Sequence, residues 1–212
     1  DNGCWVDGEM GLALGHTRLS VLDISEQGRQ PMKSQSGRYM IAYNGEIYNF
    51  LELRDDLEKK GRKFKGSSDT EVILAAIDEW GLVKAVQSFD GMFSFALWDK
   101  AEKSLHLCRD RIGEKPLYYG WVGKGNSLSF IFGSELKALT APRLWPLRIN
   151  RNVISSFLRH SYIPTPFSIY EGISKLPPGT AVSIDSSGQQ SVYQYWRLEE
   201  FLDQEKPISD ES

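Results

Sequence analysis

Strand-like runs occur in neighbouring groups along this chain, and helix-like segments lie between the groups. Apolar runs bounded by turn residues predict strands at residues 11–16, 38–43, 92–99, 104–110, 116–122 and 127–133. Two further runs, 180–185 and 191–196, bracket the polar stretch DSSGQQ and predict a hairpin. This grouping indicates an α+β fold of antiparallel sheets with helices on their outer faces.

Two longer segments carry helix signals. Segment 49–61 is rich in helix formers, has leucines near helical spacing and ends at a glycine. Segment 67–81 opens with Ser68 and has Glu71 three residues later, which predicts a capping box ahead of an apolar helix ending at Gly81. Shorter helices are expected at 134–139 and 151–161.

Composition and charge exclude several classes of protein. The 212 residues are 41% hydrophobic and 25% charged, which is ordinary for a soluble globular domain. The net charge is -3 and the basic residues are scattered, so a nucleic-acid partner is not expected. No apolar run is long enough to span a bilayer, and no signal peptide is recognisable, so no membrane partner is expected. Two cysteines without a C-x-x-C pair predict neither a disulfide framework nor a metal site, and favour a cytoplasmic protein.

Common nucleotide-binding and metal motifs are missing from the sequence. There is no Walker loop, no G-x-G-x-x-G between a strand and a helix, and no histidine pair at metal-ligand spacing. His106 and Cys108 share one face of a predicted strand, which would suit a thiol-imidazole pair. We expect instead that both pack in the sheet, because a reactive thiol needs an exposed, electropositive pocket.

Polar residues gather at the ends of three predicted elements. The stretch MIAYNGEIYNF predicts a strand that stops at Tyr43, followed by Asn44, Gly45 and Glu46. Arg18 follows the first strand, and Asp69 lies at a helix N-terminus. Each has an ordinary alternative: a surface arginine, an N-G hairpin turn, and an acid that favours the helix dipole.

Together these residues match what an amino-acid amide hydrolase requires. Its substrate carries an α-carboxylate, an α-ammonium group and a side-chain amide, so the enzyme needs a guanidinium, an acid and an oxyanion hole. Arg18, Asp69 and Asn44 with the Gly45 N–H group are candidates for these roles. Glycine suits the last role because a backbone amide approaches a substrate closely where no Cβ intervenes.

Six ordered motifs resemble the glutaminase domain of glutamine-dependent asparagine synthetases: HTRLSVLD, YNGEIYN, SSDTEVI, FDGMFSFALWD, RDRIGEKPLYYG and SELKAL. The resemblance implies a class II glutamine amidotransferase with an N-terminal-nucleophile hydrolase fold, a four-layer αββα sandwich of two antiparallel sheets. It also implies that residues 1–196 form the glutaminase domain and 197–212 a linker toward an ATP-dependent synthetase domain.

The resemblance also implies roles for individual residues. Arg18 would bind the glutamine α-carboxylate, Glu46 and Asp69 its amino end, and Asn44 and Gly45 would form the oxyanion hole. The pocket would be lined by Leu19, Ser20, Val21 and Leu22. Expected partners are L-glutamine, the synthetase domain in the same polypeptide and, as an open alternative, a second copy in a homodimer. No cofactor is expected in this domain, whereas ATP and magnesium belong to the synthetase domain.

One departure from the family pattern concerns the nucleophile. The family attacks with an N-terminal cysteine whose α-amine is the base, and the present sequence begins after that position. Cys4 does not correspond to this nucleophile, so the chain by itself is expected to hydrolyse no glutamine. Two alternatives remain: a glutaminase domain serving another acceptor, such as a sugar phosphate, or a non-catalytic docking module that kept the fold.

Overall fold

A computed structural model describes residues 2–17, 28–141 and 145–202, and it contains one large antiparallel sheet. The strand order is β11-β10-β6-β5-β4-β3. The strands are β3 (Met32–Lys33), β4 (Tyr39–Ile47), β5 (Gly91–Asp99), β6 (Ser104–Arg109), β10 (Thr180–Ile184) and β11 (Gln190–Gln194). The predicted hairpin is therefore confirmed as β10 and β11.

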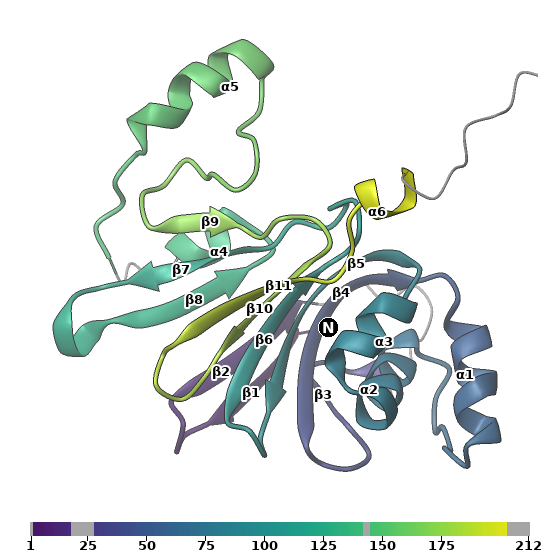
Figure 1. Ribbon diagram of the computed structural model, residues 1–212. Helices are drawn as coiled ribbons and strands as arrows, with labels where there is room; N and C mark the ends of the chain where they lie inside the picture. Colours follow the sequence, from purple (N-terminus) through teal and green to yellow (C-terminus); the bar gives the residue numbers. More distant parts are fainter. Residues whose placement is uncertain (1, 18–27, 142–144, 203–212) are drawn as a thin grey trace, which may run out of the picture.

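Three helices cover one face of this sheet (Figure 1). They are α1 (Phe50–Lys59), α2 (Asp69–Trp80) and α3 (Leu82–Ser88). The α2 helix is apolar because most of its residues are buried between α1, α3 and the sheet. Segment 82–88 was not predicted to be helical, because Gly81 reads as a stop signal; in the structure Gly81 ends α2 and directly precedes α3.

Two smaller antiparallel sheets face the other side of the six-stranded sheet. One pairs β1 (Asn2–Asp7) with β2 (Leu12–Thr17), and the other has the order β8-β7-β9. Its strands are β7 (Tyr118–Val122), β8 (Ser129–Gly133) and β9 (Ile173–Lys175). A second core, which includes Leu14, Trp98 and Leu107, fills the space between the sheet layers. The sequence did not predict β1, β3 or β9, which are short or lack a continuous apolar run.

The remaining helices lie beyond the second sheet layer or near the end of the chain. They are η2 (Gly125–Ser127), α4 (Leu136–Thr140), η3 (Arg151–Val153), α5 (Ile154–His160) and α6 (Glu199–Leu202). Leu139 of α4 packs with Val122 and Ile173 on the outer face of the three-stranded sheet. The result is the α+β sandwich with antiparallel sheets between helices that was predicted. No helix among the described residues is both long and apolar enough to cross a membrane.

The predicted capping box is only half correct. Ser68 caps α2 as expected, since its hydroxyl accepts the Thr70 N–H at 3.1 Å. The Glu71 carboxylate does not return to Ser68; it accepts the N–H groups of Lys65 and Gly66, both at 2.9 Å. Glu71 therefore fixes the loop before the helix, which the three-residue spacing alone does not reveal.

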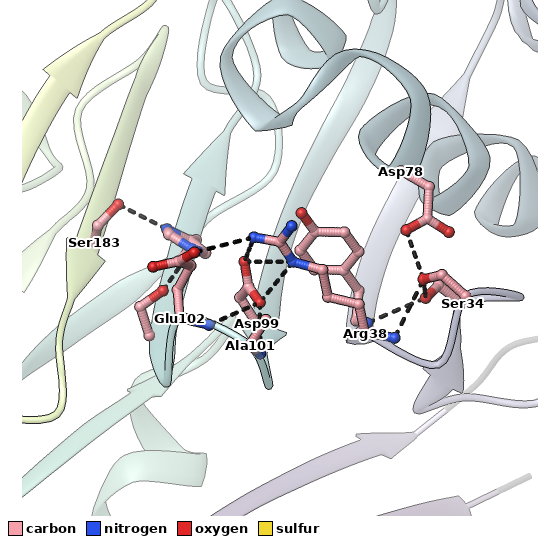
Figure 2. A network of polar contacts seen from close by, with 11 residues as sticks. Ser34, Arg38, Asp78, Asp99, Ala101, Glu102 and Ser183 are labelled. Carbon is pink, nitrogen blue, oxygen red and sulfur yellow. Dashed lines mark hydrogen bonds and ion pairs between the residues drawn. The ribbon is translucent and has the colours of Figure 1, made fainter.

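A polar network joins the strand ends at the β5–β6 turn (Figure 2). The Arg38 guanidinium donates to both carboxylate oxygens of Asp99, at 2.9 Å from Nε to Oδ1 and 2.6 Å from Nη2 to Oδ2. Beside this pair, the His106 ring lies between the hydroxyls of Ser104 at 3.0 Å and Ser183 at 2.7 Å. Tyr39, the β4 partner of Asp99, is five residues before Asn44, so the network lies about 17 Å along the strand from that residue.

Candidate active site

The strand β4 continues through Asn44, Gly45 and Glu46 to Ile47. Asn44 pairs with Ser94 and Gly45 with Phe93 of β5. The prediction that the strand stops at Tyr43 is therefore wrong, and the hairpin-turn alternative for Asn44-Gly45 is also excluded. A polar pair inside a strand reads like a turn because the sequence does not show the neighbouring strand that continues the ladder.

Gly45 is required by the close approach of β5. Its φ is +155°, which side-chain-bearing residues rarely adopt, and an added Cβ would overlap the Met92 carbonyl oxygen and lie 2.6 Å from Cα of Phe93. Gly91, two positions further along the same strand pair, has φ +158°, and its Cβ would lie 2.9 Å from Cα of Ile47. The two strands therefore meet without side chains at these two positions.

The N–H group of Gly45 points to the open edge of β4. Backbone groups alternate sides along a strand. Phe93, which lies opposite Gly45, donates its N–H to Oδ2 of Asp110 at 3.2 Å, and its carbonyl accepts the Asp110 N–H at 2.8 Å. Both backbone groups of Phe93 thus point away from β4. Gly45 therefore directs its peptide groups away from β5. The strand β3 pairs only with Met40 and Ile41, so it does not reach Gly45. Among the described residues, no strand pairs with the Gly45 N–H, which makes it a suitable donor to a ligand.

The neighbouring N–H groups on the same edge are held by side chains. The Tyr43 N–H donates to Oε1 of Gln30 at 2.6 Å, and the Ile47 N–H donates to Oδ2 of Asp69 at 3.1 Å. Gly45 lies between these two fixed donors. The Tyr43 carbonyl is bonded to Nε2 of His16 at 2.8 Å, which ties the end of β2 to the same place.

Asp69 is buried, with 5% of its surface exposed, at the first residue of α2. Its Oδ2 accepts the Tyr43 hydroxyl at 2.6 Å as well as the Ile47 N–H. Burial raises the pKa of the carboxyl despite these hydrogen bonds, and burial likewise raises the pKa of the Tyr43 hydroxyl. Asp69 therefore joins α2 to β4, and its role is not limited to a favourable interaction with the helix dipole.

Asn44 and Glu46 extend from the opposite face of the strand to Tyr43 and Ile47, because side chains alternate. Asn44 is exposed, and its Nδ2 lies 3.4 Å from Oγ of Ser134 in the SELKAL motif. Glu46 is partly buried. The structure thus gathers Asn44, Gly45, Glu46 and Asp69 around one end of β4, while Arg18, Leu19, Ser20, Val21 and Leu22 lie outside the described residues.

Arg109 and Asp110 were not singled out from the sequence, yet they shape the loop beside this strand. The fully buried Asp110 carboxylate accepts N–H groups from Phe93, Gly113, Glu114 and Lys115 at 2.6–3.2 Å. The Arg109 guanidinium donates to three carbonyls of the same region, including that of Leu176 at 2.6 Å. The available signal was the pair of charges at the end of an apolar strand, just before G-E-K-P.

The His106 and Cys108 pair is not a nucleophile. Cys108 is fully buried, and burial raises the pKa of its thiol strongly, whereas both ring nitrogens of His106 are bonded to serines. The prediction that both residues pack in the sheet is confirmed. Cys4 on β1 is a free, exposed cysteine. Within the described ranges, no group of three or more His, Cys, Asp or Glu side chains is arranged to hold a metal ion.

The layered antiparallel sheets between helices agree with the N-terminal-nucleophile hydrolase sandwich that the sequence resemblance implies. The family model described as "Glutamine amidotransferase domain" matches residues 1–196, and the chain belongs to this family. It is 38% identical over 202 residues to "Asparagine synthetase [glutamine-hydrolyzing] 3" of Bacillus subtilis, covering 94% of this chain and 31% of that protein.

Other similar proteins agree with this assignment. The "Putative asparagine synthetase [glutamine-hydrolyzing] 2" of Methanocaldococcus jannaschii is 36% identical over 216 residues, covering 94% of this chain and 40% of the relative. Among solved structures, the glutamine phosphoribosylpyrophosphate amidotransferase of B. subtilis superposes with a TM-score of 0.61 at 22% identity, covering 87% of this chain and 35% of that one. The last likeness concerns the fold alone. The chain therefore spans about a third of the length of the synthetases that it matches.

Proposed function

We propose that this chain is the domain that hydrolyses glutamine to glutamate and ammonia in an asparagine synthetase. The support is twofold: the family membership with relatives of that name, and the Gly45 N–H group on the open edge of β4. The edge N–H carries the proposal, because a donor fixed by the backbone stabilises developing negative charge without reorganising.

The chemistry at this edge is acyl transfer to a thiol. In this proposal the nucleophile is the N-terminal cysteine of the family, which the present sequence does not include, so the present chain by itself would hydrolyse no glutamine. The α-amine of that cysteine takes the thiol proton, and the thiolate attacks the side-chain amide carbon of glutamine. Negative charge develops on the amide oxygen, and the Gly45 N–H with the Asn44 amide would stabilise it. When the intermediate collapses, the proton passes from the α-amine to the leaving nitrogen, the C–N bond breaks, and a glutamyl thioester and ammonia are formed. Water then hydrolyses the thioester to glutamate and regenerates the thiol. Asp69 and Glu46 would hold the α-ammonium group, and Arg18 the α-carboxylate.

The synthetase portion of the full-length protein would use the ammonia to convert aspartate to asparagine. In this proposal ATP and Mg²⁺ bind that portion and no cofactor binds the present domain. A cytoplasmic location and a homodimer also remain proposals; the two free cysteines fit the former.

The test uses the full-length protein and compares glutamine-dependent with ammonia-dependent asparagine formation. Arg18→Ala should raise the glutamine KM by about a hundredfold, because a charge-assisted bond to the α-carboxylate is lost, and should leave the ammonia-dependent reaction unchanged. Lys84→Ala, an exposed cation on α3, is the control and should change neither. An unchanged KM in Arg18→Ala would reject glutamine binding at this site. Glutamate release without asparagine would reject aspartate as the acceptor.

A further inference from the structure

The segment 145–170, here called the arm, extends from the three-stranded sheet and carries η3 and α5. Figure 1 shows α5 apart from the facing sheets. No residue of α5 is buried. A seven-residue helix is marginal in water and normally needs packing against other parts of a protein.

The arm is nevertheless attached firmly at its base. Two isolated β-bridges, Ile149↔Tyr170 and Phe167↔Ser174, close it. Ser168, which is 2% exposed, donates to the Ile173 carbonyl at 2.8 Å, and the Lys175 ammonium group donates to the Ile163 carbonyl at 3.1 Å. These contacts hold the arm in a defined position without covering its helix.

The uncovered side chains of the arm are largely apolar. Ile154, Phe157 and Leu158 follow the i, i+3, i+4 spacing of one helix face and are 37%, 48% and 76% exposed. The other exposed apolar side chains of the arm are Leu147, Ile149, Tyr162 and Phe167. A cluster of this kind on a soluble domain marks an interaction surface.

The arm is also basic in a chain whose net charge is -3. It contains Arg148, Arg151 and Arg159 and no Asp or Glu. No acid in the described part of the chain forms an ion pair with these three arginines. Arg148 and Arg151, together with Ile149 and Ile154, line an open hollow of about 730 Å³. The fitting partner is therefore an apolar groove edged by carboxylates, which receives α5 as a helix-in-groove contact.

We propose that the arm docks on the synthetase portion of the same polypeptide. The chain covers only 31% and 40% of its asparagine synthetase relatives, so most of such a protein lies outside this domain and has to meet it for ammonia to pass. The proposal rests on the proposed function for the identity of that portion. It assigns the contact to a basic, apolar arm rather than to the sheet edge that would bind glutamine.

The first experiment measures how accessible the arm is in the full-length protein. Leu158→Cys on α5 is compared with Leu51→Cys on α1, because these leucines are 76% and 61% exposed in the isolated domain. Labelling by a maleimide is followed at each site by peptide mass spectrometry. We expect labelling at 158 to be slower by about tenfold or more, as for a locally protected site. Similar rates at the two sites would overturn the docking.

The second experiment identifies what covers the arm. Full-length protein carrying the photo-reactive amino acid benzoylphenylalanine in place of Phe157 is irradiated and the cross-linked peptides are sequenced. A cross-link to the synthetase portion within the same polypeptide is the expected result. A cross-link to residues 1–196 of a second copy, or no cross-link, would overturn the proposal. Neither measurement needs glutamine hydrolysis, so a failure of the proposed function is recognised separately by the absence of glutamate release.

Discussion

The Tyr43 hydroxyl donates a 2.6 Å hydrogen bond to Oδ2 of Asp69, and the same oxygen accepts the Ile47 N–H at 3.1 Å. One buried carboxylate oxygen thus joins α2 to two residues of β4 that flank Gly45. Both partners are donors, so the contact needs an acceptor oxygen but not a negative charge. The structural role of Asp69 and its proposed role in substrate binding can therefore be separated by substitution.

Asp69→Asn should keep the fold and lose glutamine binding. The amide oxygen can accept both donors, whereas the charge for the glutamine ammonium group is gone, so the dissociation constant should rise by about tenfold to a hundredfold. Calorimetric titration of the full-length protein with glutamine measures this, with Asp56→Asn on α1, whose side chain is 62% exposed, as the control. Normal affinity in Asp69→Asn would remove the proposed ammonium contact.

The same variant should alter the pH dependence of stability in one direction. Burial raises the pKa of Asp69 above its ordinary 3.8, so the folded state holds the proton more tightly than the unfolded state. The stability from this group is then fully present below 3.8 and is lost as the pH rises through the raised folded value. In urea unfolding, Asp69→Asn should gain stability relative to the unsubstituted protein as the pH rises from about 4 to 7. A relative gain on acidification would contradict the direction of the shift.

Gly45→Ala should destabilise the fold by more than about 3 kcal/mol, because strain at φ +155° adds to the overlap with Met92 and Phe93. Gly15→Ala on β2 is the matched control, since an added Cβ there meets nothing within 4 Å. Urea denaturation at constant pH compares the two. Equal stability of both variants would show that β5 does not constrain Gly45.

Arg38→Leu should destabilise the folded protein at neutral pH by about 1–3 kcal/mol. This is less than the cost of breaking a fully buried ion pair, because the Arg38 side chain is 41% exposed and solvent weakens the interaction. Burial alone would raise the pKa of Asp99, but the hydrogen bonds from Arg38 and the Glu102 and Ala101 N–H groups lower it below 3.8. The stabilising contribution is therefore present above 3.8 and lost as the pH falls through the lowered value.

Urea unfolding of Arg38→Leu at several pH values checks this, and its deficit should shrink in acid. Lys59→Ala, which removes an exposed pair with Asp56, is the control and should have little effect at any pH. A deficit for Arg38→Leu that is independent of pH would mean that the lost interaction is packing on Tyr39 rather than the ion pair.

Asn44→Ala should lower kcat for glutamine hydrolysis by about a hundredfold to a thousandfold if the amide is an oxyanion donor. Glutamine KM should change little, because the interaction forms in the transition state. Steady-state glutamate release from the full-length protein measures both constants. Ser94→Ala, on the paired β5 residue, is the control and should keep kcat. A fall in Asn44→Ala no larger than in the control would limit Asn44 to a structural role.

Periodicity was sufficient for the long elements and for the fold class. The strands β4, β5 and β6 and the helices α1 and α2 have enough apolar repeats to be recognised alone. The predictions that were wrong concern features set by other segments of the chain. The strand β4 continues past Tyr43 because β5 pairs with it, and the Glu71 carboxylate accepts the Lys65 N–H because the preceding loop lies beside it. The importance of Asp110 is equally non-local, since four backbone N–H groups converge on it only after the loop 111–116 has folded.

The two hydrogen bonds on the Tyr43 backbone have a consequence for engineering. His16 is bonded to the Tyr43 carbonyl, and Gln30 accepts the Tyr43 N–H. Two side chains that are far apart in the sequence therefore fix the β4 edge that carries the Gly45 N–H. Substitution of His16 or Gln30 is thus a way to adjust this edge while Asn44, Gly45 and Glu46 stay unchanged.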